Sequence, residues 1–364
     1  MRIQTALAFF LLLGTHLASA QDVRISVLGL FRPRQLTVTV SSGAALVLHA
    51  GQESLVLEGS SGRRVARIFL APDGLMLQAG DRQVPATGIH VASRKDEAAD
   101  FVLSVPGKIS RHYHGTLDVT APSDTLLSVV AMDLETAVAS AVQAESLPNT
   151  PIEALKAQSV ATRSYFAVAK GRHRDCDFCD TTHCQYLREP PSPGSAASLA
   201  TAATRGLVLA YHEQPFAAMY TRSCGGRTRT PAEIGISSHE YPYFAVTCDY
   251  CRSHPLRWRR WISQADADKL LRQGEPARLE IDRRLGWDAI PSCTFKAHTR
   301  NQDVVLEGTG QGHGVGLCQL GARAMAEAGA GFREILDHFY PNTEVVRFCV
   351  SAAAFERRTG SGTD

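Results

Sequence analysis

The sequence predicts an α+β protein, in which a strand-rich N-terminal region precedes a mixed α/β domain. Short alternating apolar runs, separated by Gly, Pro, Ser and Asp, extend from Val23 to about Val119. Helical patterns begin after about Leu126, and all nine cysteines lie beyond that point. We therefore expect a β-rich region at 21–122 and the α/β domain at 123–350.

The strands of the first region are predicted at Val23–Val27, Leu36–Val40 and Phe101–Val105. This region contains no cysteine and no carboxylate cluster. A positioning or binding module is the default interpretation.

The first 20 residues are typical of a cleavable export signal. Arg2 supplies a positive end, Ala6–Leu13 is almost entirely apolar, and Ala18-Ser19-Ala20 is a small-residue cleavage site. We expect a mature chain that starts at Gln21 and is soluble in the periplasm or at the cell exterior.

The charge balance excludes an electrostatic argument for nucleic-acid or anionic-membrane binding. The full chain carries 38 Lys and Arg against 36 Asp and Glu, a net charge of +2. No segment after the signal predicts a transmembrane helix. The last residues, 351–364, are expected to form a disordered tail.

Two helices follow the strand region. Apolar residues at positions 134, 137, 138, 141 and 142 predict an amphipathic helix over Leu134–Glu145. Because Pro148 disfavours helix in the residue before it, Glu145 is expected at the helix end, where a cleft can form. Pro151 precedes a second helix, over Glu153–Tyr165. By composition alone Glu135, Glu145 and Glu153 are equally ordinary carboxylates.

Every second residue from Gly308 to Gly316 is glycine. In an extended backbone this spacing leaves one face bare, which suits the close approach of a flat polar object such as a sugar ring. Thr309, Gln311 and His313 then project from the other face. The spacing matches no nucleotide-binding glycine motif. His313 fits a binding residue and a buried core histidine equally well.

A cluster of five potential metal ligands lies at His173, Cys176, Cys179, His183 and Cys184. Tetrahedral zinc takes four Cys or His ligands. Disulfides are the alternative in an oxidising compartment. Because nine is odd, full pairing leaves at least one thiol that is free or bound to metal.

The other cysteines are harder to interpret. Cys224, Cys248 and Cys251 form a second group, in which Cys248-x-x-Cys251 is typical of half a metal knuckle or a tight disulfide. Cys293, Cys318 and Cys349 are scattered along the chain.

Five sequence blocks in order resemble the stage II sporulation protein D (SpoIID/LytB) family, over roughly 126–346. They are the helical run Leu134–Tyr165, Asp180-Thr-Thr-His-Cys-Gln185, Ser223-Cys-Gly-Gly-Arg-Thr228, the segment Gly310–Ala322, and Ile335–Pro341.

The resemblance implies a function and its residues. Characterised members are lytic transglycosylases that cleave peptidoglycan glycan strands between MurNAc and GlcNAc and leave 1,6-anhydro-MurNAc ends. Glu145 matches their catalytic glutamate. Gln311, His313 and Gln319 would line the saccharide groove, with Ser223 as a groove or turn residue. Some members hold zinc in the Cys/His block, and the best correspondence is with the residues His173, Cys179, His183 and Cys184.

The chemistry needs one carboxyl group. Ordinary glycosidases use two, whereas here the C6 hydroxyl of muramic acid attacks the anomeric carbon itself. Glu145 would first donate a proton to the leaving oxygen and then accept one from that hydroxyl. It must therefore be protonated near neutral pH. Zinc would brace the loop beside the cleft and is not required for the reaction.

Two other functions remain open. Some relatives are described as enhancers of a cell-wall amidase, which predicts a non-catalytic glycan-binding module. A zinc-dependent peptidoglycan hydrolase is disfavoured, because four protein ligands leave no open position for water. The expected partners are glycan strands, already stripped of peptides, and a cell-wall amidase.

Overall fold

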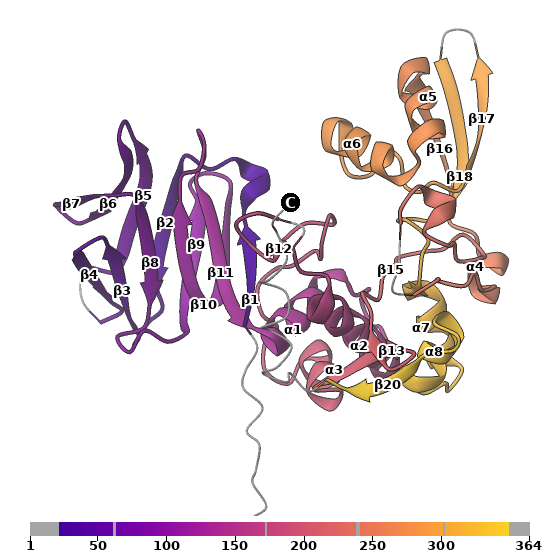
Figure 1. Cartoon of the computed structure of the whole chain (residues 1–364), viewed down its shortest axis with the longest axis horizontal. Coiled ribbons are helices and arrows are strands. Elements are labelled where there is room, and N and C mark those ends of the chain that lie inside the picture. Colours follow the sequence, from indigo (N-terminus) through magenta and orange to yellow (C-terminus); the bar gives the residue numbers. More distant parts are fainter. Residues whose placement is uncertain (1–21, 61–62, 172, 238–240, 301–302, 349–364) are drawn as a thin grey trace, which may run out of the picture.

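The computed structural model describes residues 22–60, 63–171, 173–237, 241–300 and 303–348 (Figure 1). The export signal, its cleavage site, Cys349 and the tail at 351–364 lie outside the described residues. Among the described residues, no helix combines the length and the apolarity needed to cross a bilayer.

Strands dominate the first third of the chain, and they form one 12-stranded sheet within the described residues. Its members in chain order are β1 (Asp22–Val27), β2 (Gln35–Val40), β3 (Ala45–Ala50), β4 (Glu53–Glu58), β5 (Val65–Ala71), β6 (Gly74–Ala79), β7 (Arg82–Ala86), β8 (Gly88–Ala92), β9 (Ala99–Val105), β10 (Ile109–Thr120), β11 (Leu127–Asp133) and β12 (Phe178–Cys179). The three strands predicted from sequence are confirmed as β1, β2 and β9.

The long strand β10 connects two parts of this sheet. Its first half pairs with β9 and its second half with β8 and β11. The partner changes at Gly115, where a Cβ atom would lie 2.3 Å from the carbonyl oxygen of Ala131. Alternate residues of β2 are buried, as expected for a strand with one face on a core. The last strand of this region, β11, ends beyond residue 122, and the domain boundary expected there stays a prediction.

Helices follow directly from β11. Asp133 caps α1 (Leu134–Glu145), because its side chain accepts the N–H groups of Glu135 and Thr136. The apolar stripe predicted on this helix is buried. Next come α2 (Ile152–Val168), which is mostly buried, and α3 (Ala196–Ala203). The two predicted helices are thus confirmed, and the fold is α+β in broad class.

The rest of the α/β region continues from α2 (Figure 1). Its elements are β13 (Leu207–Tyr211), β14 (Gln214–Pro215), β15 (Tyr220–Thr221), α4 (Asp249–Ser253), β19 (Leu317–Cys318), α7 (Gln319–Glu327), α8 (Phe332–Phe339) and β20 (Glu344–Arg347). Of these, β13, α7 and α8 contact α2. Strand β13 pairs with β14 and β20, and β15 pairs in parallel with β19.

An arm at residues 257–309 extends away from these helices, at the upper right of Figure 1. It contains β16 (Arg257–Ser263), α5 (Gln264–Gln273), α6 (Glu275–Leu285), β17 (Phe295–Arg300) and β18 (Asp303–Thr309). The arm has a small core of its own, which includes Ile262, Leu270, Ile281 and Leu306.

Candidate functional site

A pocket of about 910 Å³ lies where the helices, the arm and the loop after β12 meet. The end of α1, the C-terminal part of α2 and the loop at 182–186 line it. Residues of α6, the segment 287–291 and the glycine-rich segment at 311–313 also line it. The pocket is therefore built from segments far apart in the sequence, and its dimensions suit a small-molecule or oligosaccharide ligand.

Glu145 is the last residue of α1 and lines this pocket. Its carboxyl oxygen Oε1 accepts a hydrogen bond of 2.9 Å from the backbone N–H of Tyr186. Gln319 donates its side-chain amide to the backbone carbonyl of Glu145 at 3.2 Å. Two later parts of the chain thus fix both the backbone and the carboxyl group of this residue.

Burial raises the pKa of Glu145 to about 7, from an ordinary value of 4.5. The residue retains some exposure to the pocket, yet the protein atoms around its carboxyl group disfavour the charged form. Hydrogen bonds with the Tyr186 backbone and the Tyr220 side chain, and the charge of Arg222, oppose this rise. A carboxyl group with such a pKa can both donate and accept a proton near neutral pH.

Glu135 differs from Glu145 in its contacts. Its two carboxylate oxygens accept hydrogen bonds of 2.8 and 2.7 Å from the guanidinium of Arg163, which is fully buried. The backbone N–H of Gly206 adds a third, at 3.1 Å. This paired geometry assigns Glu135 to the stability of the helices.

Glu153 is also occupied elsewhere. It accepts 2.6 Å and 2.9 Å hydrogen bonds from the Lys156 ammonium and the Phe332 backbone N–H. The Lys156 hydrogen bond lowers its pKa, in the opposite direction to the shift at Glu145. Of the three glutamates that the sequence left equivalent, Glu145 is the one that lines the pocket.

Among the described residues, two more carboxylates line the pocket, both from the arm. Glu275 is buried and pairs with the Arg278 guanidinium at 2.7 and 2.5 Å. Asp288 is exposed and accepts a hydrogen bond of 3.3 Å from Gln311. Glu275 is held as a paired anion, which suits a structural role better than proton transfer.

The structure brings three of the four predicted groove residues to the pocket. Gln311, His313 and Gln319 all line it. The Nδ1 atom of His313 accepts the backbone N–H of Val315 at 3.0 Å, and burial lowers the pKa of the ring. A neutral imidazole in this position carries its proton on Nε2.

The fourth predicted groove residue, Ser223, lies elsewhere. It is 1% exposed, and its hydroxyl lies 3.5 Å from the Sγ atom of Cys251. Its backbone pairs with that of Gln311. Ser223 therefore supports the glycine-rich segment from behind and does not line the pocket.

The glycine-rich segment itself differs from the predicted extended ribbon. Gly310, Gly312, Gly314 and Gly316 all have positive φ angles, so the side chains do not simply alternate between two faces. A Cβ atom on Gly316 would lie 1.9 Å from the Met219 carbonyl oxygen. The glycines therefore do not form one bare face: Gly310 and Gly316 lie against backbone carbonyl oxygens of the protein itself, whereas Gly312 lines the pocket.

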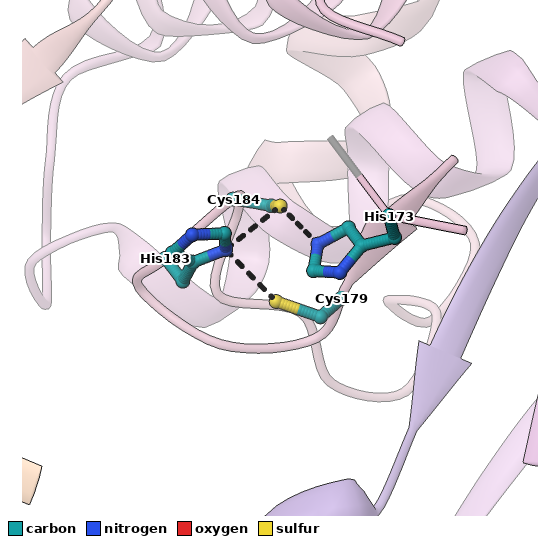
Figure 2. Close-up of side chains that lie close together, drawn as sticks. All are labelled: His173, Cys179, His183 and Cys184. Carbon is teal, nitrogen blue, oxygen red and sulfur yellow. Dashed lines mark hydrogen bonds between the residues drawn. The ribbon is translucent and has the colours of Figure 1, made fainter. Parts of the chain in front are cut away.

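The predicted metal ligands converge on one point (Figure 2). His173, Cys179, His183 and Cys184 place one ligand atom each within 4.8 Å of one another. The Cys184 sulfur lies 3.1 Å from Nε2 of His173 and 3.5 Å from Nδ1 of His183, and the latter is 3.8 Å from the Cys179 sulfur. Neighbouring ligands of tetrahedral zinc are about 3.3–3.8 Å apart. This set, which we call the His/Cys cluster, fits zinc without Cys176.

The His/Cys cluster is attached to the N-terminal sheet. Strand β12, which contains Cys179, pairs in parallel with β1. Asp180 accepts the backbone N–H of Leu28 and the guanidinium of Arg111, both at 3.0 Å. The loop that presents Tyr186 to Glu145 is thus anchored at its start by the sheet.

Several pocket residues were not singled out in the sequence. Tyr186 and Tyr220 contact Glu145, and Arg222 lies near it. Trp287, which is 39% exposed, also lines the pocket from the arm. Tyr186 directly follows a recognised block, which was a usable signal, whereas no local pattern distinguishes Trp287 from any surface tryptophan.

Comparison with known proteins finds one family model and several relatives that match parts of this chain. Residues 123–211 match the family model described as stage II sporulation protein. An uncharacterised protein of Brachyspira hyodysenteriae is 26% identical over 270 residues, covering 65% of this chain and 73% of the relative. The stage II sporulation protein D of Bacillus amyloliquefaciens is 24% identical, covering 60% and 75%.

The amidase enhancer of Bacillus subtilis is 24% identical over 275 residues, covering 54% of this chain. The chain spans 38% of the length of that relative. The matched residues 123–211 include α1 with Glu145, α2 and the His/Cys cluster. These matches confirm the resemblance to the stage II sporulation protein D family that the sequence showed.

Proposed function

We propose that the protein is a peptidoglycan lytic transglycosylase with Glu145 as its general acid and base. The observation that carries this proposal is the position of the Glu145 carboxyl group at the wall of the pocket, where burial raises its pKa to about 7. The substrate would be a glycan strand, peptide-stripped, cleaved between MurNAc and GlcNAc. The chain would act after export, in the periplasm or the cell wall.

The reaction would use the two protonation states of Glu145 in turn. The protonated carboxyl donates to the glycosidic oxygen as the bond to the anomeric carbon breaks. The carboxylate then removes the proton from the C6 hydroxyl of the muramic acid, which attacks that carbon. The product is a 1,6-anhydro ring, and no water is consumed.

The other pocket residues would bind the strand. Trp287 offers an apolar face on which a sugar ring can stack. Gln311 and the His313 ring offer polar groups for its hydroxyls. Arg222, which is exposed at the pocket, suits the lactyl carboxylate of muramic acid.

Zinc in the His/Cys cluster would be structural. Its four protein ligands would leave no open position, so the residues would hold the loop that carries Tyr186. This arrangement also speaks against a zinc-dependent hydrolase at this position.

A second candidate function follows from the amidase enhancer among the relatives. The chain would then grip glycan in the same pocket without cleaving it and would assist a cell-wall amidase. The buried, protonatable setting of Glu145 favours cleavage, because a binding site has no need for a carboxyl group with a raised pKa.

Digestion of defined strands separates these functions. Purified protein is incubated with glycan strands, with and without stem peptides, and the products are identified by mass spectrometry. Anhydro-muramyl ends support the transglycosylase. Reducing ends indicate a hydrolase, released peptides an amidase, and unchanged strands a binding module.

A further inference from the structure

A second group of cysteines converges behind the pocket. Cys224 follows β15, Cys248 and Cys251 lie at the start of α4, and Cys318 ends β19. Their four sulfur atoms all lie within 4.8 Å of one another. Each residue is at most 2% exposed. We call this group the four-cysteine cluster.

We propose that the four-cysteine cluster binds a zinc ion in a closed site of four thiolates, distinct from the His/Cys cluster. A soft, tetrahedral, all-sulfur set selects zinc or iron among the common metals, and zinc needs no redox role. With four protein ligands, such a site stabilises the fold and has no open position for a substrate.

The distances fit a tetrahedron better than a pair of disulfides. The sulfur atoms of Cys251 and Cys318 are 3.5 Å apart. A disulfide bond is about 2.05 Å long, whereas zinc–sulfur bonds of about 2.3 Å place the sulfurs at tetrahedral corners about 3.8 Å apart. The Cys251–Cys318 separation is thus too long for a disulfide and close to the edge of a zinc–sulfur tetrahedron.

Polar groups surround the sulfurs as they do around metal-bound thiolates. The Cys318 sulfur accepts the backbone N–H groups of Cys224 and Gly321, each at 3.4 Å. The Ser223 hydroxyl lies 3.5 Å from the Cys251 sulfur. Donors of this kind compensate the negative charge of a four-thiolate site. Reduced cysteines that simply filled an apolar core would need none of them.

The backbone is shaped to admit the cluster. A Cβ atom on Gly321 would lie 2.6 Å from the Cys248 sulfur, so this position of α7 must lack a side chain. The Cys248 N–H donates to the Gly226 carbonyl at 3.0 Å, which fixes the Cys248-x-x-Cys251 turn against the turn after Cys224. Two turns of the chain thus present their sulfurs to one centre.

The site would brace the pocket from behind. Cys318 directly precedes Gln319, whose side chain holds the backbone of Glu145. Strands β15 and β19, which carry Tyr220 and Cys318, pair side by side. A metal at this point would tie these strands to α4 without touching a ligand in the pocket.

The test is the metal content and coordination of the full chain, purified without chelator. Wild type is expected to contain zinc in the four-cysteine cluster. The His183→Ala variant removes the contribution of the His/Cys cluster, so the X-ray absorption spectrum of its remaining zinc should show sulfur ligands alone. Cys251→Ser is expected to lose one metal per chain. Cys293→Ser, at a free cysteine outside both clusters, is the matched control and should lose none.

The opposite results overturn the proposal. One such result is a Cys251→Ser variant with the metal content of wild type. The other is the absence of any metal ion that is coordinated by sulfur ligands alone. If Cys251→Ser does not fold, alkylation of wild type decides. The four cysteines should resist the reagent until a chelator is added, whereas ready reaction without chelator, or disulfides among them in a non-reducing peptide map, contradicts the site.

Discussion

The backbone N–H of Tyr186 donates a hydrogen bond of 2.9 Å to Oε1 of Glu145, and so joins the end of α1 to the loop of the His/Cys cluster. Cys184, a member of that cluster, lies two residues before Tyr186. The orientation of the carboxyl group therefore depends on how this loop is held. The pKa and the position of Glu145 are set by parts of the chain that follow it by about 40 to 170 residues.

Replacement of Glu135 tests its assignment to stability. Glu135→Ala leaves the buried Arg163 guanidinium without its carboxylate, and should lower the free energy of unfolding by about 3–5 kcal/mol. Urea denaturation measures this loss. Glu327→Ala, which breaks the exposed pair with Arg323, is the control and should cost about 0–1 kcal/mol. Equal effects of the two variants would refute the assignment.

The pH dependence of stability tests the pKa of Glu145. Because this pKa is raised to about 7 in the folded protein, its contribution to stability is fully present below about pH 4.5 and is lost as the pH rises through 7. As the pH rises from 5 to 8, the free energy of unfolding of Glu145→Gln should therefore increase by on the order of 1–3 kcal/mol relative to that of wild type. Parallel stability curves for the two proteins would show that the pKa is not raised.

The pH dependence of activity follows from the same group. The general acid must carry its proton when the strand binds, so kcat/KM should fall as the pH rises above about 7. Initial rates of anhydro-product formation between pH 5 and 9 measure this limb. An activity that keeps rising to pH 9 would contradict a role for Glu145 as acid.

Loss of the His/Cys cluster should act through the loop. His183→Ala is expected to lower the rate of strand cleavage about 10- to 100-fold, which is the usual effect of losing residues that support the ligands of a metal site. Cys176→Ser, at the neighbouring thiol outside the cluster, should retain activity. Rates are compared on equal amounts of folded protein, and a fully active His183→Ala variant would remove the loop from the account.

Trp287 tests the binding role of the arm. Trp287→Ala should weaken binding to glycan strands about three- to tenfold, the effect of losing an aromatic contact of about 0.5–1.5 kcal/mol. Trp261→Ala is the control, because Trp261 is 53% exposed on the same arm and does not line the pocket. Titration calorimetry with peptide-free strands measures both. An unchanged affinity of Trp287→Ala would show that the strand does not reach the arm.

Single helices and strands were predictable because the residue patterns that specify them lie within a few consecutive turns or residues of the chain. The apolar stripe and the Pro148 signal gave α1 with its end at Glu145, and alternation gave β1, β2 and β9. Five candidate metal ligands within 12 positions of the chain indicated a metal site, and the family resemblance selected the four residues of the His/Cys cluster among them. The glycine spacing was misinterpreted, because the sequence does not reveal that another segment of the same chain packs against it.

Long-range features could not be predicted. Cys318 was classed as scattered, yet its sulfur lies 3.5 Å from that of Cys251, a residue of α4 that is 67 positions away in the chain. The difference between Glu135 and Glu145 depends on Arg163, Tyr186 and the pocket, and none of these contacts follows from local periodicity. The arm that supplies Trp287 likewise gave no signal of its position over the site.

The central claim is tested most directly by comparing the products of wild type and Glu145→Gln on peptide-free glycan strands by mass spectrometry. Wild type should release fragments with 1,6-anhydro-muramyl ends, and Glu145→Gln should form them at least 10²-fold more slowly while it still binds the strands. Glu153→Gln, a glutamate outside the pocket, should cleave as wild type does. Anhydro products from Glu145→Gln at the wild-type rate would contradict the account.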